Sequence, residues 1–211
     1  IPVLSVRNEP LQNIGNRIVK RAFDIMFSFM VIILVFPFVF LIVAPLIKLS
    51  SKGPVFFKQL RSGRDNITFY CWKLRTMKVN ENADVEQARE GDVRITAIGR
   101  FLRKTSLDEL PQFYNTLIGN MSVVGPRPHM LKHTEEYSEI IDKFMVRHFV
   151  KPGITGWAQV HGLRGETRNN SLMEKRVKYD VWYLENWSLL LDMKIVVLTF
   201  TQILFGKHNG K

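Results

Sequence analysis

The residues best suited to chemistry in this chain gather in one short segment, Ser106-Leu107-Asp108-Glu109. Its two adjacent carboxylates follow Arg100, Arg103 and Lys104 and come shortly before Arg127. Paired carboxylates beside several basic residues are typical of catalytic and phosphate-binding sites. The segment is therefore the candidate active site.

The same segment also matches a capping box, in which Ser106 and Glu109 would satisfy the free backbone N–H groups at the start of a helix. Pro111 complicates that alternative, because it cannot donate to the carbonyl of Leu107, and it favours a helix that begins nearer Asp108. In both interpretations Asp108 lies at a helix N-terminus, where the helix dipole favours negative charge and can hold a phosphate. The local pattern leaves the catalytic and the structural alternatives open.

Arg127 is flanked by Pro126 and Pro128, which restrict the backbone and so direct a single guanidinium group. Arginine binds phosphate through a planar, bidentate fork. The motif is compatible with a phosphate ligand, and equally with a salt bridge inside a loop.

An uncharged apolar stretch, Ile25–Ile47, precedes the candidate site, with Pro37 near its centre. As a helix it would be roughly 35 Å long, against about 30 Å for the hydrocarbon core of a bilayer. We therefore expect it to enter a membrane. Basic residues flank it on both sides, which suits a segment that bends at Pro37 and returns to the same face. A spanning helix with a proline kink is the alternative.

Apolar periodicity predicts four helices after this stretch: from Thr105 or Ser106 to Leu117, Thr134 to His148, Met173 to Leu184, and Leu189 to Phe205. Short strands are predicted at Pro54–Phe57, Ile67–Leu74 and Met121–Val124, the first two forming a hairpin. An acidic loop or short helix is expected over Val79–Asp92, and a Gly/Pro-rich loop over Lys151–Val160. The last two helices combine aromatic and basic residues, which suits helices lying in a membrane interface; a packed pair of core helices is the alternative.

The predicted fold class is α+β and mostly helical. Its 211 residues divide into a connector over 1–16, a membrane-inserted re-entrant segment over 17–50, and a catalytic domain with interfacial helices over 51–211. The connector suggests a piece of a longer protein. The formal net charge of +11 indicates an anionic partner, and charge alone does not separate nucleic acid, lipid and phosphorylated small molecules. The single cysteine, Cys71, excludes an internal disulfide and is expected to be a packed core residue.

Six motifs in order carry a family resemblance: Lys20-Arg21-Ala22-Phe23-Asp24, Lys73-Leu74-Arg75-Thr76-Met77, Asp92-Val93-Arg94, Ser106 to Gln112, Gly125-Pro126-Arg127-Pro128 and Lys151 to Val160. Together they resemble the bacterial sugar transferase family, the monotopic phosphoglycosyl transferases. The resemblance extends from Arg17 to about Phe205. One departure is Phe36-Pro37 at the membrane break, where some members have Ser-Pro, so the re-entrant topology rests mainly on the family.

The resemblance implies transfer of a hexose-1-phosphate from a UDP-sugar to polyprenyl (undecaprenyl) phosphate, with release of UMP and with Mg²⁺ as cofactor. It places the enzyme on the cytosolic face of the bacterial inner membrane, at the first membrane step of exopolysaccharide, capsule or O-antigen assembly. Membrane lipids are then partners, an oligomer is compatible with the pattern, and no nucleic-acid partner is expected. The particular sugar cannot be read from the residues.

The resemblance also implies roles for the site residues. Asp108 would be the nucleophile that forms a covalent phosphosugar intermediate, and Glu109 would support it. Both carboxylates would be the metal ligands. Four basic residues would bind the substrate phosphates and nucleotide: Arg127, Arg103, Arg75 and Lys73.

Two other functions compete with this interpretation. A membrane-anchored basic scaffold or nucleic-acid-binding protein would use the net charge, but it explains neither the paired carboxylates nor the apolar segment. No nucleic-acid-binding motif accompanies the charge. A CDP-alcohol type phosphotransferase would need a membrane motif with several aspartates, which this chain lacks.

Overall fold

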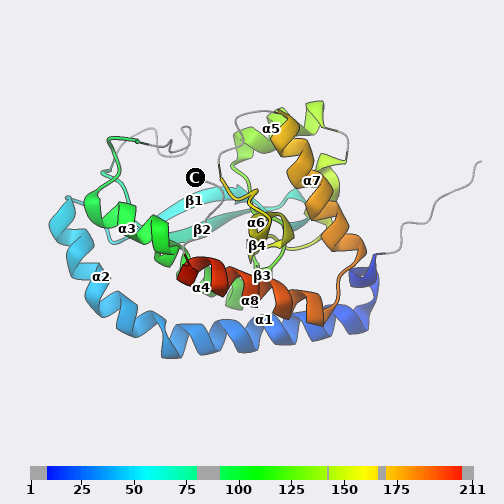
Figure 1. Ribbon diagram of the computed structural model, residues 1–211, viewed down its shortest axis with the longest axis horizontal. Helices are drawn as coiled ribbons and strands as arrows, with labels where there is room; N and C mark the ends of the chain where they lie inside the picture. Colours follow the sequence, from blue (N-terminus) through cyan, green and yellow to red (C-terminus); the bar gives the residue numbers. More distant parts are fainter. Residues whose placement is uncertain (1–8, 80–90, 142, 166–169, 206–211) are drawn as a thin grey trace, which may run out of the picture.

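Two consecutive helices form a long bent rod along one side of the molecule, and the remaining elements pack against it (Figure 1). This computed structural model describes residues 9–79, 91–141, 143–165 and 170–205. Within them the protein is α+β and mostly helical with a small hairpin, as predicted. The expected acidic loop over Val79–Asp92 lies almost wholly outside the described residues, as do the first residues of the expected connector.

The rod consists of α1 (Ile14–Leu34) and α2 (Phe36–Ser50), which meet at Val35 at an angle of 54°. Pro37 lies in the first turn of α2, where its missing N–H leaves the carbonyl of Ile33 without a helical donor. The predicted bend is thus present, and the break falls just before Pro37. No single helix in the described part of the chain is long and apolar enough to cross a bilayer, whereas the bent pair taken together is, by length and composition.

Buried charges fasten the first half of α1 to the domain. Lys20 Nζ lies 2.6 Å from Asp192 Oδ2 and donates to the carbonyl of Val124 at 2.9 Å. Asp24 Oδ1 accepts the backbone N–H of Val123 at 2.9 Å. Charges buried this deeply persist only when they are paired and hydrogen-bonded. The Lys20-to-Asp24 motif therefore attaches α1 to the strand that ends at Val124 and to the helix that carries Asp192.

The hairpin consists of β1 (Phe56–Ser62) and β2 (Thr68–Leu74), antiparallel with Gln59 opposite Cys71. The short 3₁₀ segment Arg64–Asn66 (η2) turns the chain between them. The first strand was predicted at Pro54–Phe57, which is wrong, because residues 58–62 continue the ladder up to this turn. Cys71 is free and buried, as expected.

Parallel pairing of β3 (Ser122–Val124) and β4 (Gly153–Thr155) brings two motifs together. A Cβ on Gly153 would overlap the backbone nitrogen of Gly125, so this approach requires a glycine. The Gly/Pro-rich segment, predicted as a loop, thus contains a strand, and it fixes the start of the Arg127 loop.

The helices correct several predicted boundaries. In place of one helix from Thr105 or Ser106, α3 ends at Thr105, a 3₁₀ turn follows, and α4 begins only after Pro111. Ser106, with φ 58°, adopts the left-handed conformation that separates them. The helix predicted from Thr134 to His148 is also interrupted, and Lys143 there has φ 64°. The bounds are η1 Pro10–Gln12, α3 Ala97–Thr105, η3 Leu107–Glu109, α4 Gln112–Ile118, α5 Leu131–Ile140, η4 Phe144–Phe149, α6 Trp157–Val160, α7 Asn170–Glu185 and α8 Leu189–Phe205.

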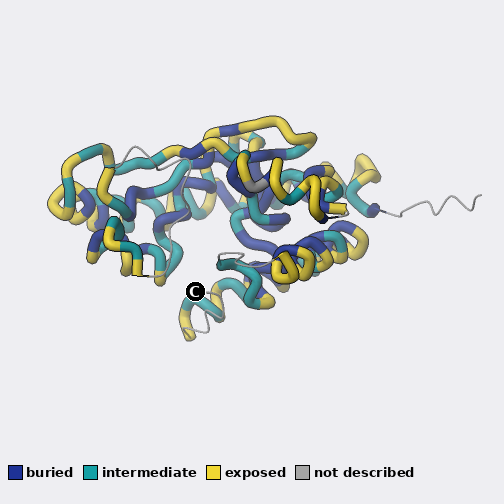
Figure 2. Tube along the Cα trace, turned by 90° about the horizontal axis from the view of Figure 1, so that it is seen from above, coloured by how far each residue is buried: buried dark blue, intermediate teal, exposed yellow. Residues whose placement is uncertain are grey.

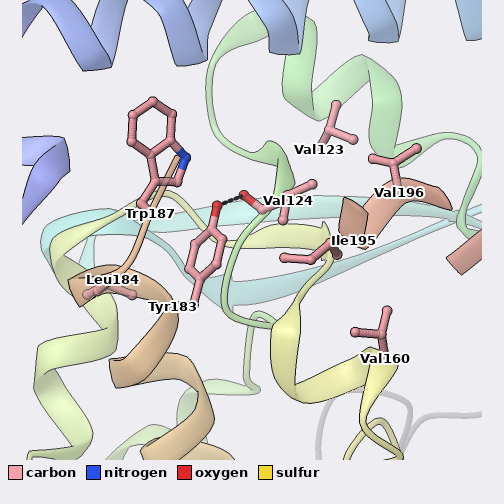
Figure 3. Packing of buried hydrophobic residues seen from close by; sticks show 8 residues of the cluster. All are labelled: Val123, Val124, Val160, Tyr183, Leu184, Trp187, Ile195 and Val196. Atoms are coloured by element: carbon pink, nitrogen blue, oxygen red, sulfur yellow. Dashed lines mark hydrogen bonds between the residues drawn. The ribbon is translucent and has the colours of Figure 1, made fainter. Parts of the chain in front are cut away.

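The main hydrophobic cluster joins β3 to α6, α7 and α8 (Figure 3). Ile195 and Val124 are fully buried there, and the hydroxyl of Tyr183 donates to the carbonyl of Val124 at 3.2 Å. Buried positions gather where the elements meet, and exposed positions lie on the outer sides of the helices (Figure 2). The core therefore holds β3 and the loop after it rigidly against the last two helices.

Candidate active site

Asp108 and Glu109 lie on the 3₁₀ turn η3 between α3 and α4, and both side chains are buried. The backbone N–H of Glu109 bonds to the carbonyl of Ser106 at 3.2 Å, which closes the turn. Asn115, on α4, bonds through its side-chain amide to the backbone of Tyr70 and Trp72 on β2, at 2.8 and 2.9 Å. These contacts hold the acidic pair against the end of the hairpin.

Glu109 is surrounded by three cations. Arg127 Nη2 lies 2.6 Å and Lys73 Nζ 3.0 Å from Glu109 Oε1, and Arg164 Nη2 lies 2.7 Å from Oε2. Burial alone would raise the pKa of Glu109, but the charges of Arg127, Lys73 and Arg164 outweigh it and hold that pKa well below its ordinary value. Glu109 is thus a permanent anion that gathers cations.

This arrangement contradicts the capping-box alternative. The backbone N–H of Ser106 bonds to the carbonyls of Leu102 and Arg103, not to the side chain of Glu109. Ser106 Oγ accepts a hydrogen bond from Arg164 Nη1 at 2.8 Å instead of capping a helix. Asp108 also does not lie in the first turn of a long helix, because α4 starts at Gln112.

The carboxyl group of Asp108 makes no hydrogen bond or ion pair with any other residue that the structure describes. Burial, followed by repulsion from Glu109, raises its pKa, against the opposing charges of Lys73, Arg103 and Arg164. The two neighbouring acids therefore differ in state. Both oxygens of Glu109 are engaged by cations, whereas the carboxyl group of Asp108 has no such contact among the described residues.

Two of the predicted phosphate-binding residues lie next to this pair. Arg127 contacts Glu109 as described and lies 3.3 Å from Gln159 Oε1. The salt bridge considered for Arg127 is therefore present, and it involves the candidate site itself. Arg103 donates from Nε to Thr76 Oγ1 at 2.9 Å, and the charge of Asp108 partly offsets the lowering of its pKa by burial.

Lys73 also reaches the pair, but Arg75 does not. The guanidinium of Arg75 donates to the carbonyls of Ile47, Ser51 and Lys52 at 3.1, 2.7 and 3.1 Å. It therefore ties the end of β2 to the end of α2. Phosphate binding by Arg75 stays a prediction, with its described hydrogen bonds directed to the α2 end.

Arg164 is the site residue that the sequence reasoning missed. It lies between Gly162 and Gly165, just after the Lys151-to-Val160 motif. Glycines near Arg164 free the backbone, whereas the prolines beside Arg127 restrict it, so the flanking residues gave no equivalent signal. The contacts of Arg164 with Glu109 and Ser106 make it equal in rank to Arg127.

Only part of the ligand set predicted for Mg²⁺ is free to bind a metal in the structure. No group of three or more His, Cys, Asp or Glu residues that could hold a metal occurs among the described residues. Mg²⁺ is commonly held by one or two carboxylates together with substrate phosphates and water. Asp108 fits that mode, whereas both oxygens of Glu109 are taken by cations. Glu109 would reach a metal only after Arg127 or Arg164 released it.

The site is a buried acidic pair with three cations converging on Glu109, on a mostly helical α+β domain with a bent apolar rod. Such an arrangement supplies the positive charge that binding of a phosphorylated group requires. The chain belongs to the bacterial sugar transferase family, which it matches over residues 15–206. This confirms the family indicated by the motifs.

Named relatives share much of the sequence. A UDP-glucose:undecaprenyl-phosphate glucose-1-phosphate transferase of Klebsiella pneumoniae is 51% identical over 200 residues, covering 94% of this chain and 43% of the relative. A UDP-N-acetylgalactosamine-undecaprenyl-phosphate N-acetylgalactosaminephosphotransferase of Aeromonas hydrophila is 42% identical over 190 residues, covering 89% and 44%. The exopolysaccharide production protein PSS of Rhizobium leguminosarum bv. phaseoli is 42% identical over 184 residues, covering 85% and 92%. The chain thus spans less than half the length of the first two.

Proposed function

We propose that this chain is the catalytic part of a phosphoglycosyl transferase that moves a hexose-1-phosphate from a UDP-sugar to undecaprenyl phosphate and releases UMP. The observation that carries the proposal is the contrast within the acidic pair: Glu109 holds three cations, and the neighbouring Asp108 has no partner among the described residues. The names of the relatives supply the substrate class, because they are transferases of sugar phosphates to undecaprenyl phosphate.

The reaction balances in two displacements at one phosphorus atom. A carboxylate oxygen of Asp108 attacks the phosphorus that bears the sugar, its bond to the bridging oxygen breaks, and UMP leaves with that oxygen. A phosphate oxygen of undecaprenyl phosphate then attacks the same phosphorus, and the carboxylate of Asp108 leaves. The product is the lipid-linked diphosphosugar. A covalent intermediate lets a soluble and a membrane-bound substrate use one site in turn.

The cations around Glu109 make this attack electrostatically feasible. Two anionic groups, a carboxylate and a diphosphate, must approach each other, and fixed positive groups offset their repulsion. Glu109 keeps Lys73, Arg127 and Arg164 converged before substrate arrives, so little reorganisation is needed during the reaction. Mg²⁺ bound by Asp108 and the diphosphate would add charge neutralisation at the same place.

The bent rod is proposed to be the membrane-inserted part, re-entrant from the cytosolic face. The start of α1 is fixed to the domain by Lys20, and the end of α2 is fixed to the same domain by Arg75. Since both ends are held by one folded unit, both lie on one side of the bilayer if the bend inserts. The same contacts disfavour the spanning alternative.

Exposed apolar side chains support this orientation. They cover the bend region of the rod and one side of α8, which runs beside α1 (Figure 1): Met26, Phe29, Leu34, Phe38, Leu41, Ile42, Leu190, Val197, Phe200 and Leu204. Many large apolar side chains left exposed on a folded domain are typical of a membrane contact. The opposite face of α8 is buried at Asp192, Ile195 and Val196. The last helix thus combines the two alternatives weighed for it, with one face in the core and one face available to the membrane interface.

The proposal is tested by asking whether UMP release is coupled to transfer of the sugar phosphate to the lipid. The protein, kept in its native membrane or in lipid nanodiscs, is supplied with UDP-glucose, UDP-galactose or UDP-N-acetylgalactosamine, with and without undecaprenyl phosphate. We expect UMP and lipid-linked phosphosugar to accumulate together, in equal amounts and only with the acceptor lipid after the first turnover. Release of UDP in place of UMP would overturn the proposal, because it would mean that the sugar moves without its phosphate.

A further inference from the structure

Three buried charged residues lie behind the site and take no part in the proposed reaction: Arg147, Arg176 and Asp180, at 2%, 5% and 2% exposure. Arg147 belongs to η4, and the other two lie one turn apart on α7. Replacing buried ion pairs by well-packed apolar residues is often neutral or stabilising. Their presence therefore calls for a reason other than stability.

Their hydrogen bonds lead to the two loops that supply the site arginines. Arg147 Nη2 donates to the backbone carbonyl of Arg127 at 3.0 Å and lies 2.7 Å from Asp180 Oδ2. Arg176 Nη2 donates to the carbonyl of Gly165, the residue after Arg164, at 2.6 Å. One cluster, formed by η4 and α7, thus holds the backbone beside both arginines that converge on Glu109.

We infer that Arg147, Arg176 and Asp180 are positioning residues that set the separation of Arg127 and Arg164, and through them the seat of the substrate diphosphate. The inference rests on the proposed function. An arginine side chain is long and flexible, so its guanidinium is placed accurately only when the backbone that carries it is fixed. Hydrogen bonds from Arg147 and Arg176 to backbone carbonyls of the two loops provide that fixation. Asp180 forms an ion pair with Arg147 and adds the attraction of its charge to Arg176. Burial, followed by the charge of Arg147, lowers the pKa of Arg176 to about 10, which leaves it charged near neutrality.

The cluster carries a cost that a purely structural role does not explain. Among the residues that the structure describes, Arg147 Nε and Nη1 and Arg176 Nε have no hydrogen-bond partner. Buried donors without partners destabilise a fold. The hydrogen bonds from the cluster fix the backbone of the two loops that carry Arg127 and Arg164.

The experiment is a double-mutant cycle on transfer kinetics. Arg176→Met removes the bond to Gly165, and we expect about a 100-fold loss of kcat/KM, the scale of a misplacement near 1 Å. Arg176→Lys, which can still donate one bond, should recover most of that loss. In an Arg164→Met background, Arg176→Met should change the rate less than about threefold, because the group it positions is already absent.

Met173→Ala is the matched control, since Met173 is fully buried on the same helix and packs in an apolar cluster. It should lower the melting temperature and leave kcat/KM of the folded protein unchanged. The inference is overturned if Arg176→Met and Arg164→Met lose activity independently, or if Arg176→Met behaves like Met173→Ala. If Arg176→Met does not fold, Arg176→Lys takes its place in the cycle with Arg164→Met. Its loss of kcat/KM is smaller, and the test is again whether that loss disappears in the Arg164→Met background. Absence of transfer by the parent protein would overturn the proposed function and this inference together.

Discussion

Replacing Glu109 with Gln isolates the charge that gathers the site cations, because the side chain keeps its size. The glutamine amide retains one oxygen acceptor, and its NH₂ group would face a guanidinium. Lys73, Arg127 and Arg164 would then repel one another without a central anion. We expect them to separate and to lose the convergence that a diphosphate requires.

The magnitude follows from burial and from the number of partners. Removing one partner of a buried ion pair costs about 3–5 kcal/mol of folding free energy. The three cations are 20%, 23% and 24% exposed, so solvent screens part of the loss, and the lower end of that range applies. For a chain of this size, ~3 kcal/mol corresponds to roughly 6–12 °C in melting temperature. Loss of a preorganised electrostatic group costs about 10²–10³ in kcat.

The assay measures UMP release and thermal unfolding on the same preparations of parent and Glu109→Gln protein. Glu135→Gln is the matched control, because Glu135 is exposed on α5, and it should change neither quantity. If Glu109→Gln loses melting temperature and keeps its rate, Glu109 has only a structural role. That result would refute the reasoning that links the cation cluster to catalysis.

Three further predictions concern the need for an arginine at position 127, the pH dependence of the reaction, and the membrane topology. Arg127→Lys should lower kcat/KM for the UDP-sugar, because an ammonium cannot reproduce the fork that meets Glu109, and equal kinetics would exclude that role. The carboxyl group of Asp108 must be ionised to react, and its pKa is raised, so kcat/KM should begin to fall with decreasing pH above the ordinary aspartate range. Because Glu109 contributes to the raised pKa, Glu109→Gln should shift this fall in kcat/KM to lower pH. A pH–rate profile of the variant's residual activity measures the shift. To test the topology, single cysteines replace the exposed Arg17 or Lys52 in a Cys71→Ser background. Both should resist an impermeant maleimide in intact spheroplasts and react after lysis. Labelling of position 17 from outside the cell would mean that the segment spans the membrane.

Local patterns predicted the elements whose ends are marked by strong signals. The last helix has the predicted bounds Leu189–Phe205, and Gly119, with φ 95°, ends α4 as expected. The turn before β2 also lies where Asp65 and Asn66 indicated it. At Gly119, Asp65 and Asn66 the residue that stops or turns the chain does so through its own backbone preference, which sequence alone reveals.

Tertiary contacts decided what the patterns missed. The first turn of α3 packs so closely on Thr76 that only a glycine, Gly99, fits there, a requirement set by a tertiary contact and not by periodicity. Phe144 is buried after the left-handed Lys143, and this packing outweighs the propensity for one continuous helix. Arg164 could not be matched with Glu109 because 55 residues separate them in the chain.

The motifs located the acidic pair, but the difference between its members required the structure. Asp108 and Glu109 are adjacent and chemically similar, and the family resemblance alone assigned their roles. Three cations converge on one carboxylate, and none contacts the other among the described residues. Lys73 comes from β2, and Arg127 and Arg164 come from the loops after β3 and α6. Such convergence depends on backbone positions far apart in sequence.

The most direct test of the central claim is intact-protein and peptide mass spectrometry after incubation with UDP-sugar in the absence of acceptor lipid. The account predicts a hexose-phosphate adduct on the peptide that contains Asp108, discharged when undecaprenyl phosphate is added. Asp108→Asn should fold, show no adduct and retain less than about a tenth of the activity, a loss of at least 1.4 kcal/mol in barrier terms. An adduct that persists in Asp108→Asn, or steady transfer by the parent protein with no adduct on this peptide, would contradict the account.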